Sequence, residues 1–221
     1  MLSVDSLVAG YSGNPVIGPV SFSLQRGEAL LVTGPNGVGK TTLLKTIATV
    51  LKPLSGSMTL FGADIRKQRR RIFFLEERVN LPLSLTPVEY LRVIGSVYGV
   101  DADFTGLPAR FGVPRGTPMS KFSQGQRRRV QLAGAYVASK SADLIILDDP
   151  LVGLDDYSVE ALVPLLVSEL LEQGRIVVVS TKMRELERLL SERIPGRLKI
   201  LDALKYTRVA PKLGEEGARD G

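Results

Sequence analysis

The stretch ALLVTGPNGVGKTTLLKTI, residues 29–47, places the strongest constraint on how this chain can fold. Its first five residues, 29–33, are typical of a buried strand, and a helical pattern runs from about residue 40 to residue 51. Gly34, Gly37 and Gly39 lie between the two and let the backbone curl sharply from one into the other. A buried strand that feeds a helix through such a turn predicts an α/β fold with a mainly parallel sheet.

The turn itself, GPNGVGKTT, matches the phosphate-binding pattern G-x-x-x-x-G-K-[ST], known as the P-loop. Its backbone N–H groups can point at phosphate oxygens, and the start of the following helix adds a favourable dipole. Lys40 is expected to reach the β- and γ-phosphates, Thr41 to ligate Mg²⁺, and Thr42 to contact phosphate. The predicted nucleotide contacts in this turn are Gly34, Pro35, Asn36, Gly37, Val38, Gly39, Lys40, Thr41 and Thr42.

A second stretch, DLIILDDPLVGLD at 143–155, places two carboxylates at the end of a predicted buried strand. Buried charges are costly unless they are needed there, and a P-loop needs a carboxylate on a neighbouring strand to hold its metal. Asp148 fits that role. Asp149 is expected to polarise an attacking water, and the alternative is that it caps a turn or helix.

The alternation of predicted strands and helices is interrupted once, by a largely helical insertion. We predict a P-loop NTPase core with a mainly parallel sheet, an N-terminal antiparallel β region and an inserted helical subdomain, all within one domain. The expected divisions are a core at 1–78 and 141–205, the helical subdomain at 79–140 and a flexible tail at 206–221.

Composition excludes several kinds of chemistry. The chain has no His and no Cys, so histidine bases, histidine or thiolate metal sites and disulfides are excluded. No apolar run approaches the roughly 18 residues of a membrane span, and the N-terminal stretch lacks the features of a signal peptide. The net charge of +6 is compatible with an anionic partner or with an ordinary solvated surface, and nucleic acid is an unlikely partner.

The stretch KFSQGQRRRVQLAGAYV resembles the LSGGQ signature of ABC ATPases, with Ser123, Gly125 and Gln126 in the signature. Tyr11 is similar to the aromatic residue that stacks on adenine in that family. LKPLSGSMTLFG looks like its L-x-P-x-x-G segment, and LVGLD like its D-loop, with Asp155 as the acid. The resemblance covers about residues 1–205, and it identifies the chain as similar to the ATP-binding protein of an ABC transporter.

The resemblance implies ATP and Mg²⁺ as ligands and a second ABC domain as a partner, in a homodimer or a heterodimer. Each ATP would lie between the P-loop of one copy and Ser123, Gly125 and Gln126 of the other, so that ATP holds the dimer together. A separate transmembrane permease would bind the helical subdomain, with residues 78–98 as the expected contact surface, unless their apolar stripe packs inside the subdomain. The protein would then be cytoplasmic and peripheral on the inner face of the cell membrane.

Three positions depart from the family pattern. Asp149 stands where Glu is usual, Lys182 stands where His is usual, and Glu76 replaces the Q-loop glutamine, with Glu77 possible after a one-residue shift. Asp149, Lys182 and Glu76 remain the expected catalytic residues, and Thr41, Asp148 and Glu76 the expected metal ligands. A shorter carboxylate and a side chain that cannot accept a hydrogen bond predict slow ATP hydrolysis.

Three alternatives stay open at this point. The chain could be a catalytically degenerate ATP-binding subunit of a heterodimer, or a soluble ABC ATPase outside transport. An unrelated P-loop kinase or GTPase would leave the FSQGQ stretch unexplained. Neither the transported substrate nor the direction of transport follows from this chain.

Overall fold

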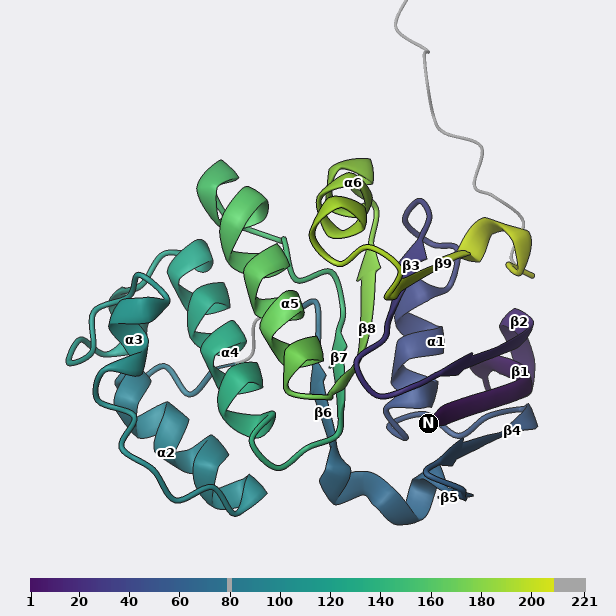
Figure 1. Cartoon of the computed structure of the whole chain (residues 1–221), viewed down its shortest axis with the longest axis horizontal. Coiled ribbons are helices and arrows are strands. Elements are labelled where there is room, and N and C mark those ends of the chain that lie inside the picture. The colour runs from purple at the N-terminus through teal and green to yellow at the C-terminus, as the bar shows by residue number, and fades with distance from the viewer. Residues whose placement is uncertain (79–80, 209–221) are drawn as a thin grey trace, which may run out of the picture.

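The computed structural model describes residues 1–78 and 81–208 and confirms the predicted α/β fold (Figure 1). The strands are β1 (Leu2–Tyr11), β2 (Asn14–Leu24), β3 (Ala29–Thr33), β4 (Ser55–Leu60), β5 (Ala63–Asp64), β6 (Ile72–Leu75), β7 (Leu144–Leu147), β8 (Ile176–Thr181) and β9 (Leu198–Asp202). The α-helices are α1 (Lys40–Ile47), α2 (Pro87–Tyr98), α3 (Leu107–Arg110), α4 (Gln124–Ala138), α5 (Val163–Glu172) and α6 (Arg184–Arg193). Short helical turns are η1 (Ile65–Arg71), η2 (Met119–Lys121), the π-helical η3 (Ser158–Leu162) and η4 (Ala203–Lys205).

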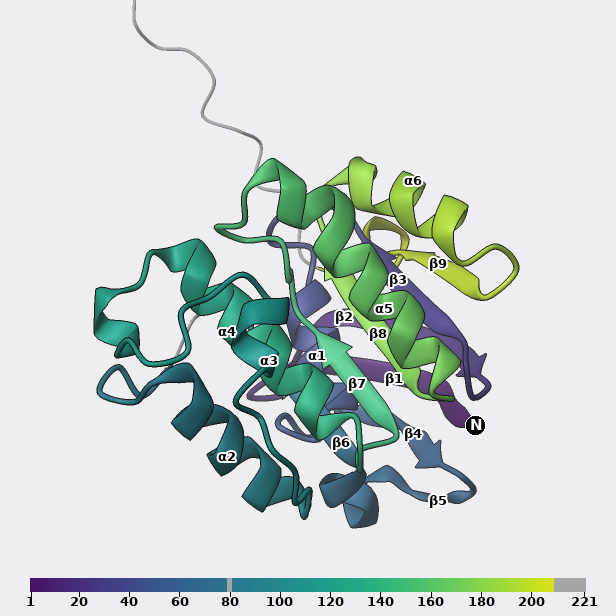
Figure 2. The same cartoon turned by 60° about the vertical axis from the view of Figure 1, so that its left-hand side comes forward.

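The central sheet has five parallel strands in the order β6-β7-β8-β3-β9. Its strands are apolar throughout because both faces are covered, as is usual for parallel sheets. Alternate residues of β7 enter different cores: Ile145 joins the cluster formed with α4 and α5, while Ile146 joins the cluster formed with α1 and the N-terminal strands. Figure 2 shows α4 and α5 in front of β7 and β8, with α1 behind them.

The second sheet is antiparallel, with strand order β2-β1-β4-β5, and confirms the predicted antiparallel region. Its apolar side chains, including Leu7, Val20 and Leu60, share a core with α1. This packing holds the start of α1, and therefore the glycine-rich turn before it, between the two sheets.

The segment from residue 81 to residue 140 contains α2, α3, η2 and α4, on the left of Figure 1. Both long helices start with a capping box, formed by Thr86 with Glu89 and by Ser123 with Gln126. Such reciprocal hydrogen bonds satisfy N–H groups that the first helical turn leaves unpaired. No helix of the described residues is long and apolar enough to cross a membrane.

The C-terminal segment differs from the predicted flexible tail at its start. Tyr206 packs against the core beside α1, and its carbonyl accepts a hydrogen bond from Gly18 N at 2.9 Å. Arg208 Nε donates to Gly18 O at 2.7 Å. These contacts fix residues 206–208 against β2, and the rest of the predicted tail, from residue 209, lies outside the described residues.

Candidate functional site

The glycine-rich turn leads from the end of β3 into α1. Gly34, Gly37 and Gly39 have φ angles of 141°, 85° and 102°, which explains why glycine is needed at these positions. Lys40, 8% exposed, folds back so that its Nζ donates to Gly34 O at 2.7 Å and to Pro35 O at 2.9 Å. Burial lowers the pKa of Lys40, and the carboxylates of Asp149 and Asp148 oppose that effect. The turn therefore holds a cation beside its own backbone N–H groups, which is a favourable environment for phosphate.

Asp148 and Asp149 follow β7 and are both buried. Asp148 Oδ1 accepts a hydrogen bond from Ser180 Oγ at 2.6 Å, and the same hydroxyl accepts one from Asp149 N at 2.9 Å. Ser180, at the end of β8, thus links the two acids. The backbone of Asp149 is left-handed, with φ of 40°, which directs its side chain differently from that of Asp148.

Each of these acids keeps one buried oxygen without a hydrogen-bond partner, Asp148 Oδ2 and Asp149 Oδ1. Burial raises the pKa of Asp148, against the hydrogen bonds from Ser180 and Thr41. Burial also raises the pKa of Asp149, while the nearby Lys182 acts to lower it. Buried polar atoms normally have partners, so two such oxygens in one place indicate a site built for a bound group.

A cavity of about 370 Å³ brings these groups together. Residues of the glycine-rich turn and the start of α1 line it, including Lys40 and Thr41, with Asp148 and Asp149 opposite. Its volume lies in the usual range for small-ligand sites. Val16, on β2, also lines the cavity, and the sequence analysis did not single it out.

The structure places Glu77, rather than Glu76, in this cavity. The Glu76 carboxylate instead lies 3.5 Å from Lys45 Nζ on α1. The position of Glu77 agrees with the one-residue shift that the sequence left open, and which of the two acids has the catalytic and metal-binding role stays a prediction. The reason for the different positions is the end of β6: Leu75 is the last paired residue, and the chain beyond it turns so that successive side chains diverge.

Arg128 on α4 fixes that turn. It is fully buried, and its guanidinium donates to Glu76 O at 2.9 Å and to Glu77 O. Sequence analysis did not single out Arg128. Its position could have been found from helical spacing, since Leu132 and Ala135 follow it on the buried face of α4.

We predict that Glu77→Gln changes the Mg²⁺ dependence of ATP turnover and that Glu76→Gln does not. A carboxylate binds Mg²⁺ more strongly than an amide, so the Glu77 variant should need several-fold more Mg²⁺ for half-maximal rate. The measurement is turnover over a Mg²⁺ titration at fixed ATP. If Glu76→Gln raised the Mg²⁺ concentration needed for half-maximal rate and Glu77→Gln did not, Glu76 would be the residue that binds Mg²⁺.

The signature residues lie at the start of α4, outside this cavity. Ser123 Oγ accepts from Gln126 N at 3.2 Å, and Gln126 Oε1 accepts from Ser123 N at 3.1 Å. Gly125 lies against the loop after β7, where a Cβ on Gly125 would come 2.5 Å from Gly153 O. Asp155 in that loop pairs with Arg129 and accepts from Ser158 N at 2.9 Å.

Neither Lys182 nor Tyr11 lines the cavity around Lys40. Lys182 follows β8 and lines, with Asp149, a neighbouring cavity of about 570 Å³. It also lines a cavity of about 600 Å³ that reaches Gly34 and Pro35. Tyr11 ends β1 at the hairpin with β2, is 48% exposed, and does not line the cavity around Lys40.

The donor set fits magnesium. Thr41 and Asp148 line the same cavity, and Asp148 Oδ2 has no hydrogen-bond partner within the described residues. Mg²⁺ prefers oxygen ligands and is commonly held by one or two carboxylates together with substrate phosphates.

Comparison with known proteins gives one consistent result. Residues 17–152 match the sequence pattern of the ABC transporter family. The chain is 32% identical over 204 residues to the Nod factor export ATP-binding protein I of Rhizobium leguminosarum bv. viciae, which covers 87% of this chain and 63% of that protein. It is 31% identical over 192 residues to the cytochrome c biogenesis ATP-binding export protein CcmA of Cupriavidus pinatubonensis, with 83% and 84% covered.

Structural similarity agrees with sequence similarity. A solved structure described as an ABC transporter ATP-binding protein from Pyrococcus furiosus has a TM-score of 0.81 and 31% identity, covering 93% of this chain and 98% of that one. The family match spans more than half of the chain, and the two curated relatives are ATP-binding proteins. The chain therefore belongs to the ABC transporter family, among its ATP-binding proteins.

Proposed function

We propose that this chain binds and hydrolyses ATP as a subunit of an ABC transporter, pairing with a second ABC domain and driving a separate membrane-spanning permease. The observation that carries the proposal is the convergence of Lys40, Thr41, Asp148 and Asp149 on one cavity. Two of its carboxylate oxygens have no partner, as expected of a site that completes its hydrogen bonding with ligand.

Each residue then has a role in phosphoryl transfer to water. The N–H groups of the glycine-rich turn and Lys40 hold the phosphates, and Thr41, Asp148 and Glu77 hold Mg²⁺, which neutralises phosphate charge. Asp149 orients and polarises the attacking water. Lys182, beside Asp149, stabilises charge on the γ-phosphate in the transition state.

The dimer proposal rests on where the signature lies. Ser123, Gly125 and Gln126 are outside the cavity around Lys40, so they cannot complete the site of their own chain in this conformation. Ser123 begins α4, whose positive dipole end would face the γ-phosphate of a nucleotide on the second ABC domain. Tyr11, at its exposed hairpin, is proposed to stack on adenine where the nucleotide extends beyond the cavity.

Contact with the permease is proposed for residues 78–98, of which 79–80 lie outside the described residues. Within α2, Val93 is 50% exposed and Val97 is 70% exposed, an unusual exposure for two valines one turn apart. The same helix begins just after the segment that carries Glu77, so movement at the nucleotide reaches this surface by a short path. Such a contact would place the protein on the inner face of the cell membrane, and the names of both curated relatives favour export as the direction.

Hydrolysis is proposed to be slow, and two reversions test this. Asp149→Glu restores the reach of the carboxylate, and Lys182→His restores a side chain that can donate and accept. Since about 1 Å of misplacement can cost on the order of 100-fold, either variant should raise ATP turnover by about 10-fold or more. Turnover is measured for the purified chain, alone and with its permease, with Asp149→Asn as an inactive control.

The outcomes separate the competing functions. Unchanged or lower rates in both reversions would mean that the site works with its own residues, and slow hydrolysis would be abandoned. ATP binding without turnover in every variant would favour a degenerate subunit of a heterodimer. Absence of ATP binding would contradict the proposal as a whole.

A further inference from the structure

The helical turn η1 is strongly basic and lies between β5 and β6 at the bottom of Figure 1. Five of its seven residues are cations: Arg66, Lys67, Arg69, Arg70 and Arg71. Arg66 pairs with Asp64 at 2.6 Å. Lys67 and Arg70 are exposed, and neither makes an ion pair or a side-chain hydrogen bond within the described residues.

Two further arginines join this turn through one carboxylate. Asp143 Oδ2 accepts from Arg71 Nε at 2.6 Å, and its Oδ1 lies 2.7 Å from Arg26 and 3.8 Å from Arg175. We call η1 together with Arg26 and Arg175 the basic pole. It holds seven cations against two carboxylates, Asp64 and Asp143, an excess of five in a chain whose formal net charge is +6.

We propose that the basic pole binds the surface of an anionic lipid membrane directly. A cluster of this size is attracted to negatively charged headgroups, and each cation near the surface strengthens binding several-fold. The basic pole alone carries an excess of five positive charges, and such a local excess favours an anionic surface as its partner.

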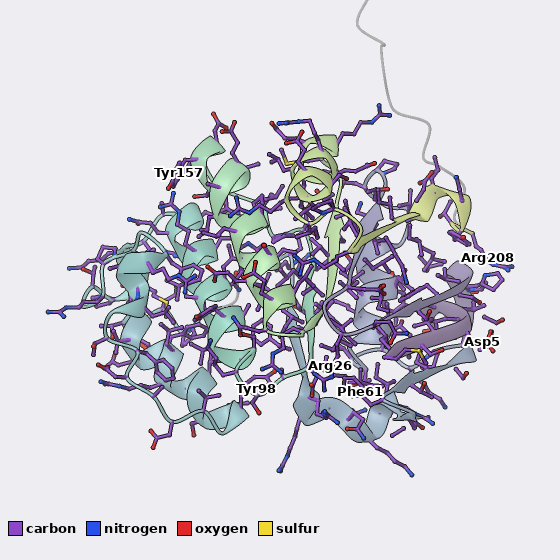
Figure 3. All side chains as sticks on the ribbon, in the orientation of Figure 1. Asp5, Arg26, Phe61, Tyr98, Tyr157 and Arg208 are labelled. Carbon is purple, nitrogen blue, oxygen red and sulfur yellow. The ribbon has the colours of Figure 1, made fainter. Side chains whose placement is uncertain are left out.

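The neighbourhood of the basic pole favours lipid over nucleic acid. A base could stack on Phe61, the aromatic ring beside these arginines. That ring is already in contact with two arginines, because the guanidinium carbons of Arg26 and Arg71 lie 4.3 Å and 4.7 Å from its centroid. Figure 3 labels Arg26 and Phe61 side by side at this end. Arg69 Nε donates to Thr49 Oγ1 at 3.2 Å, and the next residue, Val50, is 62% exposed. Cations beside an exposed apolar side chain suit a membrane interface.

The basic pole is separate from the nucleotide cavity. It lies at the amino ends of the parallel strands, since η1 leads into β6 and Asp143 precedes β7. Glu77, Asp148 and Asp149 lie at the carboxyl ends of these same strands. Lipid contact would therefore leave the cavity accessible. The inference needs neither ATP nor a permease, and its failure would leave the proposed function unaffected.

The experiment compares two charge-reversed variants of the full chain in vesicle sedimentation. One variant carries Lys67→Glu and Arg70→Glu. The control carries Arg193→Glu and Lys205→Glu, which change the net charge equally on α6 and η4, outside the basic pole. All four residues are exposed and unpaired within the described residues, so neither variant removes a structural contact. Vesicles of phosphatidylcholine are used alone and mixed with phosphatidylglycerol.

We expect the unaltered chain to bind the mixed vesicles at low salt and to be released as salt rises. The Lys67 and Arg70 variant should bind at least about 20-fold more weakly, because two cations near an anionic surface contribute roughly fivefold each even before charge reversal. The control should change binding less than about threefold, through net charge alone. A milder pair, Lys67→Gln with Arg70→Gln, should fall between the two.

Three results would overturn the inference. The first is no binding to mixed vesicles at low salt. The second is an equal loss in both charge-reversed variants, which would make the effect one of total charge. The third is tighter binding to polyuridylate than to mixed vesicles, abolished by the Lys67 and Arg70 variant, which would assign the basic pole to nucleic acid.

Discussion

Replacing Lys40 with alanine should lower ATP turnover at least about 100-fold and weaken ATP binding as well. The ammonium is buried in the glycine-rich turn, 2.7 Å from Gly34 O and 2.9 Å from Pro35 O, at the place where phosphates would lie. Removing it takes away the cation that balances phosphate charge in a site that already holds two buried carboxylates. Turnover and the affinity for a fluorescent ATP analogue are the measurements.

Lys45→Ala is the matched control for this prediction. Lys45 lies on the same helix, 3.5 Å from Glu76 and outside the cavity. A partly exposed ion pair of this kind is worth little, so turnover should change less than about threefold. Equal losses of turnover in the two variants would show that any substitution in this helix lowers activity. That result would contradict the specific role proposed for Lys40.

Replacing Gly125 with alanine should abolish most turnover and also destabilise the fold by about 1–3 kcal/mol. The added Cβ would lie 2.5 Å from Gly153 O, and a backbone carbonyl cannot move away as a flexible side chain can. Either the start of α4 or the loop that carries Asp155 must shift. The start of α4 is proposed to meet the second ABC domain, so a shift of about 1 Å would misplace Ser123 for catalysis.

Gly116→Ala provides the control, because a Cβ at Gly116 would meet nothing within 4 Å and its φ is not positive. Thermal unfolding and turnover should be close to those of the unaltered chain. If Gly125→Ala unfolded at the same temperature as Gly116→Ala and kept full turnover, the close contact with Gly153 would contribute to neither stability nor activity, and the prediction would be wrong.

The sequence by itself determined the parts of this protein that consecutive residues build. The glycine-rich turn, Lys40 and Thr41 are within a few positions of each other, so their geometry follows from local backbone conformation. The apolar run before Asp148 and Asp149 predicted a buried strand with acids at its end, and β7 has that form.

Only the tertiary structure shows that Glu77, and not Glu76, lines the cavity around Lys40. The difference is one residue at the end of β6, where the alternation of side chains along the strand no longer applies. Arg128 sets the turn there by reaching carbonyls some fifty positions away in the sequence. The link from Ser180 to Asp148 and Asp149 joins two neighbouring strands in the same way.

The basic pole also depends on contacts between segments that are distant in the sequence. The run RKQRRR is visible in the sequence, but Arg26 and Arg175 join it only because Asp143 and Phe61 bring three distant segments together. Local rules determine turns, caps and strand ends because their interactions span a few residues. Which distant groups then meet depends on how whole elements pack, and that is fixed by the fold of the entire chain.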